Sequence, residues 1–419
     1  MKLLYLAHRI PYPPDKGDKI RSYHELRALV DCGHEVHLLA FAGGIDDQEH
    51  ETELARHCAS VRIIKLRRSE SLLRTVWSLV TNEALSTGYF HSGEMARAVT
   101  DATASHDFDA VFVYSGVMAQ YVPDHLASRT VVDLVDVDSE KWLDYSRVVK
   151  WPRSWLYRLE SARLRKFETG VILKFPQTFL ATSREAALLE KSLDEFSRRA
   201  KVTLMTNGVD LEFFNVRNEP SHEKPKHLVF VGAMDYFANI DGVKWFVDDV
   251  LPLIRLRKPE VIFQIVGSNP ARAIRKLAQS AGIEVTGYVV DVRPYLRKAA
   301  VCVVPLRIAR GVQNKVLESM ACGRPVVAAP ESVAGLGLTD GQELIVAGSP
   351  ERFAESVIGI MEDAALSETL SLSARNFVEQ RHAWKPLLQG MVEVVESVAG
   401  SRTMSGSDLS NKNTRKANR

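Results

Sequence analysis

The sequence predicts an α/β protein with two doubly wound, Rossmann-like domains that face each other across a cleft. Short runs of apolar and β-branched residues alternate with longer amphipathic stretches along the whole chain. This alternation is typical of parallel sheets covered by helices on both faces. The runs are numerous enough for two sheets, and a length of 419 residues favours two domains over one.

The predicted strands fall into two sets separated by a polar break. The first set covers residues 2–7, 35–41, 61–66, 110–114, 130–135, 178–182 and 201–205. The second set covers residues 227–232, 261–267, 283–287, 301–305, 325–329 and 343–347. The break, NEPSHEKPKH at 218–227, has two prolines and no periodicity, so we expect a linker between domains 1–217 and 228–398. The polar stretch 399–419 is expected to be disordered.

Composition argues against several classes of protein. A hydrophobic content of 46% is typical of globular proteins, and a net charge of +2 argues against a dedicated nucleic-acid binder. The four cysteines form no C-x-x-C pair, so we expect reduced thiols, no metal site and a cytoplasmic location. The start, MKLLYLA, predicts a first strand rather than a signal peptide, and no run reaches the ~18 apolar residues of a membrane span.

A charged segment, PLRIARGVQNKVLESMACGRPVVAAP at 305–330, lies between two predicted strands. Pro305 should end the first strand, and a helix should run from about 314 to 322 before Gly323 stops it. Arg307 and Arg310 lie in the loop before this helix. In open α/β sheets ligands bind beyond the carboxyl ends of strands, which makes this loop the main candidate site.

The helix itself carries Lys315 and Glu318, which are three residues apart and share a face. A helix N-terminus with Arg and Lys beside it suits a diphosphate. Glu318 could accept hydrogen bonds from a ribose diol, and Gly311 would let the backbone approach the ligand. The alternative is a solvated loop with a surface ion pair between Lys315 and Glu318.

The segment resembles the signature of the retaining, GT-B-fold glycosyltransferases of family four (glycosyl transferases group 1). In that family a loop with Arg and Gly precedes K-x-x-E-x-M-A-x-G-x-P-V-V, which this chain matches from Lys315 to Val327. Further stretches that resemble the family are HRIPYPPDKGDK (8–19), GHEVHLLAF (33–41), TNGVDLEFF (206–214) and VGAMDYFANIDGVKWF (231–246). DVDSEKW (136–142) and the YRLESARLRKFE helix are similar to a bacterial subgroup associated with exopolysaccharide synthesis and the PEP-CTERM/exosortase system.

The resemblance implies a nucleoside-diphosphate-sugar donor, a glycan or lipid-linked glycan acceptor, retention at the anomeric carbon, and neither metal nor cofactor. Arg307 and Lys315 would neutralise charge on the leaving diphosphate, and Glu318 would hold the ribose. The loop after residue 287 would meet the base. The other residues expected to bind substrate are Gly17, Asp18, Gly232, Tyr288, Val289, Arg310, Gly311, Asn314 and Val316.

Two departures from the family pattern bear on this interpretation. The family's E-x7-E motif has an acidic residue eight positions before Glu318, where this chain has Arg310. Many members also carry Arg and Lys after the first strand of the second domain, where this chain has MDYFAN (234–239). Sugar contacts would therefore differ, and diphosphate neutralisation would depend more heavily on Arg307 and Lys315.

An acidic stretch after another predicted strand is a candidate acceptor site. Asp136, Asp138 and Ser139 would face the acceptor, and Asp138 could accept the proton of its hydroxyl. The alternative is a helix start with Asp138 or Ser139 as N-cap. Similarly, His8 either lines the cleft or is a satisfied polar loop residue, and Gly17 either approaches the donor phosphate or ends a proline-rich loop.

Two stretches, 67–80 and 150–168, interleave basic and aromatic residues. They predict either contact with the cytoplasmic membrane face or ordinary amphipathic helices with snorkelling arginines. Two rival functions stay open at this stage. One is a nucleotide-sugar epimerase of similar fold, and the other is a catalytically degenerate partner subunit, which Arg310 would favour.

Overall fold

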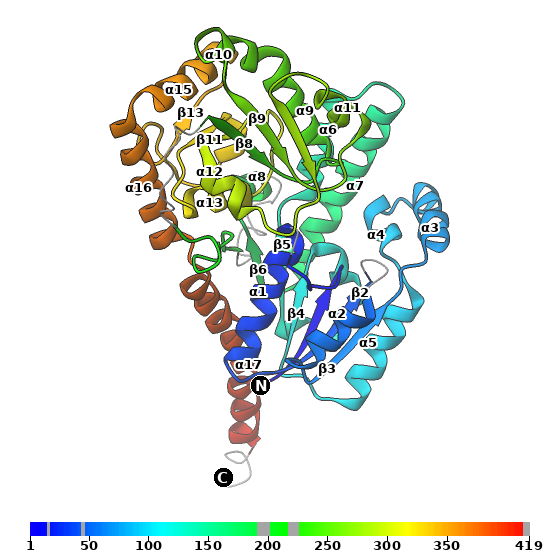
Figure 1. The fold of residues 1–419 in the computed structure, drawn as a ribbon. Helices are drawn as coiled ribbons and strands as arrows, with labels where there is room; N and C mark the ends of the chain where they lie inside the picture. Colours follow the sequence, from blue (N-terminus) through cyan, green and yellow to red (C-terminus); the bar gives the residue numbers. More distant parts are fainter. Residues whose placement is uncertain (15–16, 43–46, 191–201, 217–225, 414–419) are drawn as a thin grey trace. The chain divides into compact units, whose positions relative to one another are not determined.

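The computed structural model describes residues 1–14, 17–42, 47–190, 202–216 and 226–413. These residues form two compact units, one of Met1–Met205 with Lys385–Arg419 and one of Thr206–Trp384. Each unit is built on one parallel sheet with helices packed against it (Figure 1). The predicted class of two Rossmann-like α/β domains is confirmed.

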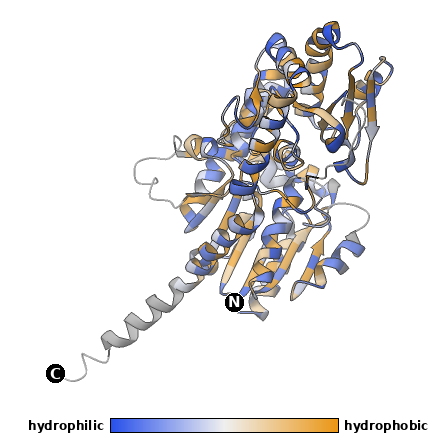
Figure 2. Ribbon diagram, turned by 60° about the vertical axis from the view of Figure 1, so that its left-hand side comes forward, coloured by the Kyte–Doolittle hydropathy of each residue, from blue (hydrophilic) through white to orange (hydrophobic). Residues whose placement is uncertain are grey.

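The N-terminal unit has a seven-stranded sheet in the order β3-β2-β1-β4-β5-β6-β7. Its strands are β1 (Lys2–Ala7), β2 (Glu35–Phe41), β3 (Ser60–Ile64), β4 (Ala110–Tyr114), β5 (Thr130–Val135), β6 (Gln177–Leu180) and β7 (Val202–Leu204). Its helices are α1 (Gly17–Asp31), α2 (Asp47–Ala55), α3 (Arg68–Thr81), α4 (Leu85–Tyr89), α5 (Gly93–Ser105), η1 (Gly116–Tyr121), η2 (Asp124–Arg129), α6 (Asp138–Val148), α7 (Arg153–Lys174), α8 (Ser183–Glu190) and α17 (Trp384–Asn413). The central strands are mainly hydrophobic along their length (Figure 2), as burial on both faces requires.

The second unit has a six-stranded sheet in the order β10-β9-β8-β11-β12-β13. Its strands are β8 (His227–Val231), β9 (Ile262–Val266), β10 (Ile283–Gly287), β11 (Ala299–Val304), β12 (Val326–Ala328) and β13 (Ile345–Val346). Its helices are α9 (Phe237–Trp245), η4 (Phe246–Val250), α10 (Leu251–Arg257), α11 (Arg272–Leu277), α12 (Arg293–Lys298), α13 (Asn314–Ala321), α14 (Pro330–Val333), α15 (Pro350–Glu362) and α16 (Ala364–Arg381). The pairings between these strands are parallel in both sheets, for example β1 with β4 and β8 with β11.

The units divide the chain differently from the predicted domains 1–217 and 228–398. The first unit ends at Met205, because the segment that follows packs into the second unit. The N–H of Val209 donates to the His382 carbonyl at 2.7 Å, and a Cβ on Gly208 would lie 2.4 Å from the Trp384 ring. The predicted linker 218–227 falls mostly outside the described residues.

The C-terminal stretch also differs from its prediction. Residues from Lys385 onward belong to the first unit, where Glu396 forms an ion pair with His34 at 3.1 Å. Helix α17 continues through Asn413, so the described part of the predicted disordered tail 399–419 is helical. None of the helices in the described ranges has an apolar stretch long enough to cross a membrane.

Candidate active site

The reversals of strand order indicate where each unit would bind a ligand. In a doubly wound sheet, ligands bind beyond the carboxyl ends of the strands at the switch point. This point lies between β1 and β4 in the first sheet and between β8 and β11 in the second. The loop after β11 is the one that contains Arg307, Arg310 and Gly311. The charged segment therefore follows the carboxyl end of β11, as the sequence predicted, and the strand order places it at the switch point of its own sheet.

Lys315 lies in the first turn of α13, which begins at Asn314 as expected. Its ammonium donates a hydrogen bond to Asn239 Oδ1 at 2.8 Å and lies 5.0 Å from the centre of the Phe230 ring. Burial lowers the pKa of Lys315 to about 8, although the nearby Glu318 carboxylate acts in the opposite direction. Lys315 is thus a desolvated cation at a helix N-terminus, which favours binding of an anion.

Glu318 lies one turn further along the same face. Burial raises its pKa to about 7, and the charge of Lys315 only partly offsets this effect. Both side chains are half-buried rather than solvated, so the predicted alternative of an exposed surface pair does not describe them. Perturbed titration of two neighbouring groups in this position is typical of functional sites.

Arg307 is held by an acidic residue that the sequence analysis did not single out. Its Nη2 and Nε atoms lie 2.7 and 3.1 Å from the two carboxylate oxygens of Asp241 on α9. The guanidinium carbon is 5.9 Å from the centre of the Trp245 ring. A diphosphate would share Arg307 with Asp241, so the direct role predicted for Arg307 remains a prediction.

Asn239 is the second residue that the sequence analysis missed. It is 4% exposed, and its Nδ2 donates to the Ala233 carbonyl at 2.8 Å. A Cβ on Gly232 would lie 2.8 Å from Asn239 Nδ2, so this glycine packs against the amide, and its contact with substrate remains a prediction. Asn239 and Asp241 both lie in the quoted stretch 231–246, but no charge spacing connects them to Lys315 or Arg307.

The loop before α13 has the conformation that its glycine suggested. Gly311 has a φ of 62°, in the left-handed region that favours glycine. The carbonyl of Arg310 accepts a hydrogen bond from Gln313 Nε2 at 2.9 Å. After β10, Tyr288 is 73% exposed, whereas Val289 packs against the hydrophobic core of the unit. Tyr288 and Val290, which is 91% exposed, are therefore accessible side chains of the loop predicted to meet the base.

Val316 does not fit its predicted role in substrate binding. Its side chain is fully buried in the core of the second unit, and its N–H donates to the Gln313 carbonyl at 2.9 Å. The amphipathic period of α13 turns this position inward, because Lys315 and Glu318 occupy the other face. Asn314, the first residue of α13, is half-buried. Its Oδ1 accepts a hydrogen bond from Asn207 Nδ2 at 2.8 Å.

In the first unit, Asp138 is the first residue of α6. Its side chain is 46% exposed and lies 3.5 Å from the ammonium of Lys141. The N-cap position is occupied by Val137, which makes no side-chain cap. The alternative expectation, with Asp138 or Ser139 as N-cap, is therefore wrong. The Asp138 carboxylate is instead partly exposed to solvent beside Lys141.

Two carboxylates from neighbouring helices satisfy the start of α6 instead. Glu168 of α7 accepts hydrogen bonds from the N–H and hydroxyl of Ser139 at 3.0 and 2.5 Å. Glu185 of α8 accepts one from the Val137 N–H at 2.8 Å. Both are buried, so they replace the missing side-chain cap. They were not predicted, because partners from distant segments leave no local pattern.

Asp136 lies beside these carboxylates. Burial, together with the charges of Glu185 and Asp138, raises its pKa to about 7. Its Oδ1 atom is buried without a hydrogen-bond partner among the described residues. A small cavity adjoins it, lined by Gly116, Val117, Leu134, Asp136, Asp138, Leu164, Phe167 and Glu168.

Glu168 should make the protein less stable as the pH rises. Burial raises its pKa to about 8 from an ordinary value of 4.5, against hydrogen bonds from Ser139. The protonated Glu168 carboxyl stabilises the folded protein relative to the unfolded chain. This stabilisation is complete below the pKa that Glu168 has in the unfolded chain, and it is lost as the pH rises through its pKa in the folded protein. We expect the free energy of unfolding to fall by about 2 kcal/mol between about pH 6 and pH 8 from this group.

Urea denaturation across this pH range would measure the effect. Glu168→Gln cannot ionise, so its unfolding free energy should fall less steeply with pH than that of the wild type. The exposed residue Glu351 offers a control, since Glu351→Gln should keep the wild-type slope. Equal slopes for wild type and Glu168→Gln would contradict the assignment.

The start of α1 is held by residues of the preceding loop. Asp18 lies 2.6 Å from Arg9 Nη1 and 3.7 Å from His8 Nε2. Burial alone would raise the pKa of Asp18, but the hydrogen bond with His8 and the charge of Arg9 outweigh it and lower the pKa. His8 stacks on Tyr114, with ring centres 5.7 Å apart. Asp18 thus ties the first turn of α1 to His8 and Arg9, and its direct contact with substrate remains a prediction.

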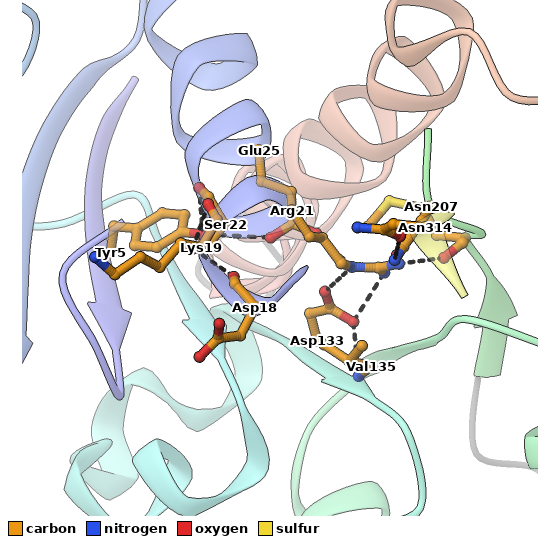
Figure 3. Close-up of polar contacts among 11 residues, drawn as sticks. Tyr5, Asp18, Lys19, Arg21, Ser22, Glu25, Asp133, Val135, Asn207 and Asn314 are labelled. Atoms are coloured by element: carbon orange, nitrogen blue, oxygen red, sulfur yellow. Dashed lines mark hydrogen bonds and ion pairs between the residues drawn. The ribbon is translucent and has the colours of Figure 1, made fainter. Parts of the chain in front are cut away.

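A buried ionic network joins α1 to the sheet (Figure 3). The guanidinium of Arg21 binds Asp133 of β5 through two bonds of 2.6 and 3.0 Å, and Glu25 at 2.9 Å. Its Nη1 also donates to the Met205 carbonyl at 2.6 Å. Asp133 Oδ1 accepts the N–H of Val135, whose φ of 65° is rare for a β-branched residue. The network therefore fixes the backbone that leads to Asp136.

Comparison with known proteins bears mainly on the second unit. Residues 225–363, about a third of the chain, match the model of the family described as glycosyl transferases group 1. The match includes the motif from Lys315 to Val327 and supports the predicted family, whereas the exopolysaccharide-associated subgroup remains a prediction.

Similar proteins extend this result. An uncharacterized glycosyltransferase from Methanocaldococcus jannaschii is 23% identical over 218 residues, which are 49% of this chain and 55% of that protein. The chain therefore aligns with about half the length of this relative. Sucrose-phosphate synthase from Thermosynechococcus elongatus has a TM-score of 0.72 at 17% identity, covering 96% of this chain and 100% of that chain.

HepE from Anabaena, in complex with UDP, has a TM-score of 0.67 at 15% identity, covering 95% of this chain and 100% of that chain. Another structure of HepE holds UDP-glucose. These likenesses show that the fold is GT-B. With the family match, they support glycosyl transfer.

Proposed function

We propose that this protein transfers a sugar from a nucleoside-diphosphate sugar to a glycan acceptor. The observation that carries the proposal is Lys315, a desolvated cation in the first turn of α13 at the switch point between β8 and β11. A leaving diphosphate gains negative charge as the glycosidic bond breaks. A cation with little water around it stabilises that charge more strongly than a solvated one.

The neighbouring residues suit the rest of the donor. Glu318 presents a carboxyl group that can accept hydrogen bonds from a ribose diol, and Gly311 leaves room for a close backbone approach. In the first unit, Asp138 is the exposed carboxylate that we propose to receive the acceptor's proton. We further propose retention at the anomeric carbon and transfer without a metal ion.

The acceptor that we propose is a lipid-linked glycan of exopolysaccharide synthesis, modified on the cytoplasmic side of the membrane. This part of the proposal is supported by the likeness of residues 136–142 and of the YRLESARLRKFE helix to the exopolysaccharide-associated subgroup. The complexes of HepE with UDP and UDP-glucose support a uridine donor as the first one to test.

A thermal-shift screen with UDP, GDP, ADP, CMP and dTDP would test donor binding. One diphosphate at about 100 times its Kd should stabilise the wild type by about 2.7 kcal/mol and should stabilise Lys315→Ala much less. The absence of a shift with every nucleotide, or equal shifts in both proteins, would contradict the proposed site.

NMR of the donor sugar without acceptor would separate transfer from epimerisation, because only an epimerase would convert the donor alone.

A further inference from the structure

Helix α3 presents its apolar side chains to solvent. The exposed fractions of Leu72, Leu73, Val76, Trp77 and Val80 are 61%, 71%, 62%, 61% and 76%. Positions separated by three or four residues lie on the same side of a helix, which relates 72, 76 and 80 to one another and links 73 to 76 and 77. These five side chains, here called the α3 apolar face, therefore form one continuous stripe.

The opposite side of α3 is polar and faces the protein. Ser71 and Ser78 are each 1% exposed. Packing against α4 is close, because a Cβ on Gly88 would lie 2.0 Å from Ser78 Oγ. An ordinary surface helix buries its apolar stripe and exposes its polar one, so α3 has the reverse orientation.

Contacts from α7 hold α3 and α4 in this orientation. Arg163 donates to the carbonyls of Ser78 and Leu79, at 2.8 and 3.2 Å, in the last turn of α3. Glu160, which is 2% exposed, accepts the N–H groups of Leu85 and Ser86 at the start of α4. The backbone groups on the buried sides of α3 and α4 are thus hydrogen-bonded by Arg163 and Glu160. These hydrogen bonds would be lost if α3 turned its apolar face inward.

The charges around α3 indicate the chemistry of its partner. Residues 65–81 contain four basic residues and one acidic residue. Lys65, Arg67 and Arg74 are exposed. Leucine and valine on one face, tryptophan at its edge and cations beside it are the features of a helix that lies in the interface of an anionic bilayer.

The size of the face argues against a stable protein partner. A specific protein interface takes about 20–30 residues on each side. The α3 apolar face offers five apolar side chains of a single helix, which is enough for shallow insertion into a lipid interface. We propose that α3 docks this protein on the surface of an anionic phospholipid bilayer, with the α3 apolar face in the interfacial layer.

Vesicle flotation of the full chain would test this docking. Wild-type protein should float with vesicles of phosphatidylcholine mixed with phosphatidylglycerol, and less with phosphatidylcholine alone. The triple variant Leu73→Gln, Trp77→Gln, Val80→Gln should bind about tenfold or more weakly, because it loses the largest part of the inserted surface. The readout needs no sugar donor, so it is independent of the proposed transferase activity.

A matched control uses exposed leucines outside α3. Leu256 and Leu372 are 82% and 63% exposed, so Leu256→Gln with Leu372→Gln removes comparable apolar surface and should leave vesicle binding unchanged. Wild-type binding by the triple variant, or equal flotation with neutral and anionic vesicles, would overturn the proposal. So would a wild-type dimer in sedimentation velocity that the triple variant abolishes, because the face would then cover a second copy.

Discussion

Lys315→Ala should reduce sugar transfer by about a hundred- to a thousandfold while the protein stays folded. Removing one preorganised group that stabilises developing negative charge typically has an effect of this size. The side chain is half-buried and donates to Asn239 Oδ1, so its removal should leave one unpaired amide oxygen and only a modest loss of stability. Initial rates of transfer, with saturating donor and acceptor, would measure the change.

A lysine of the same unit provides the control for this prediction. Lys244 is exposed on α9, the helix that also carries Asn239, and Lys244→Ala should transfer sugar at the wild-type rate. Wild-type transfer together with wild-type nucleotide binding by Lys315→Ala would reject the assigned site. An unchanged maximal rate at saturating donor, with weaker nucleotide binding, would reject the catalytic role alone, because Lys315 would then stabilise the bound donor and the transition state equally.

The fold could be predicted from the sequence because parallel strands buried on both faces carry their own signal. The runs KLLYLA, EVHLLAF, AVFVY, TVVDLV and IEVTG coincide with β1, β2, β4, β5 and β10 to the residue. The boundary between the units could not be predicted in this way. It depends on the packing of Gly208 against Trp384, which are distant in sequence and belong to no common period.

The parts of the candidate site that form a local pattern could be predicted from the sequence, and the contacts between distant segments could not. Lys315, Glu318 and the start of α13 follow from a loop that enters a helix after a strand, which is a local pattern. Asn239 and Asp241 contact Lys315 and Arg307 from helix α9, which follows a different strand, so only the folded sheet brings them together. Val316 was assigned to the site by its position in the motif, whereas the helical period buries it.

Arg21→Met should destabilise the protein by about 3–5 kcal/mol, which is the usual cost of removing one partner of a buried ion pair. Arg21 is 1% exposed and Asp133 is fully buried, so the substitution would leave a carboxylate without its cation. Burial and the neighbouring Asp133 carboxylate already raise the pKa of Glu25, so loss of the guanidinium would leave two buried acidic groups side by side with no cation between them. Urea denaturation would measure the loss.

Two further variants decide whether the network, rather than the volume of Arg21, is responsible. Arg27 lies on the same helix and forms an i,i+4 ion pair with Asp31 that is more exposed to solvent. Arg27→Met should therefore lower the free energy of unfolding by less than about 1 kcal/mol. Adding Asp133→Asn to Arg21→Met removes the uncompensated charge, so the double variant should be more stable than the sum of the two single changes predicts. Strict additivity would show that Arg21 and Asp133 stabilise the protein independently. In that case the strained backbone at Val135, which leads to Asp136 and Asp138, would not depend on the Arg21 guanidinium.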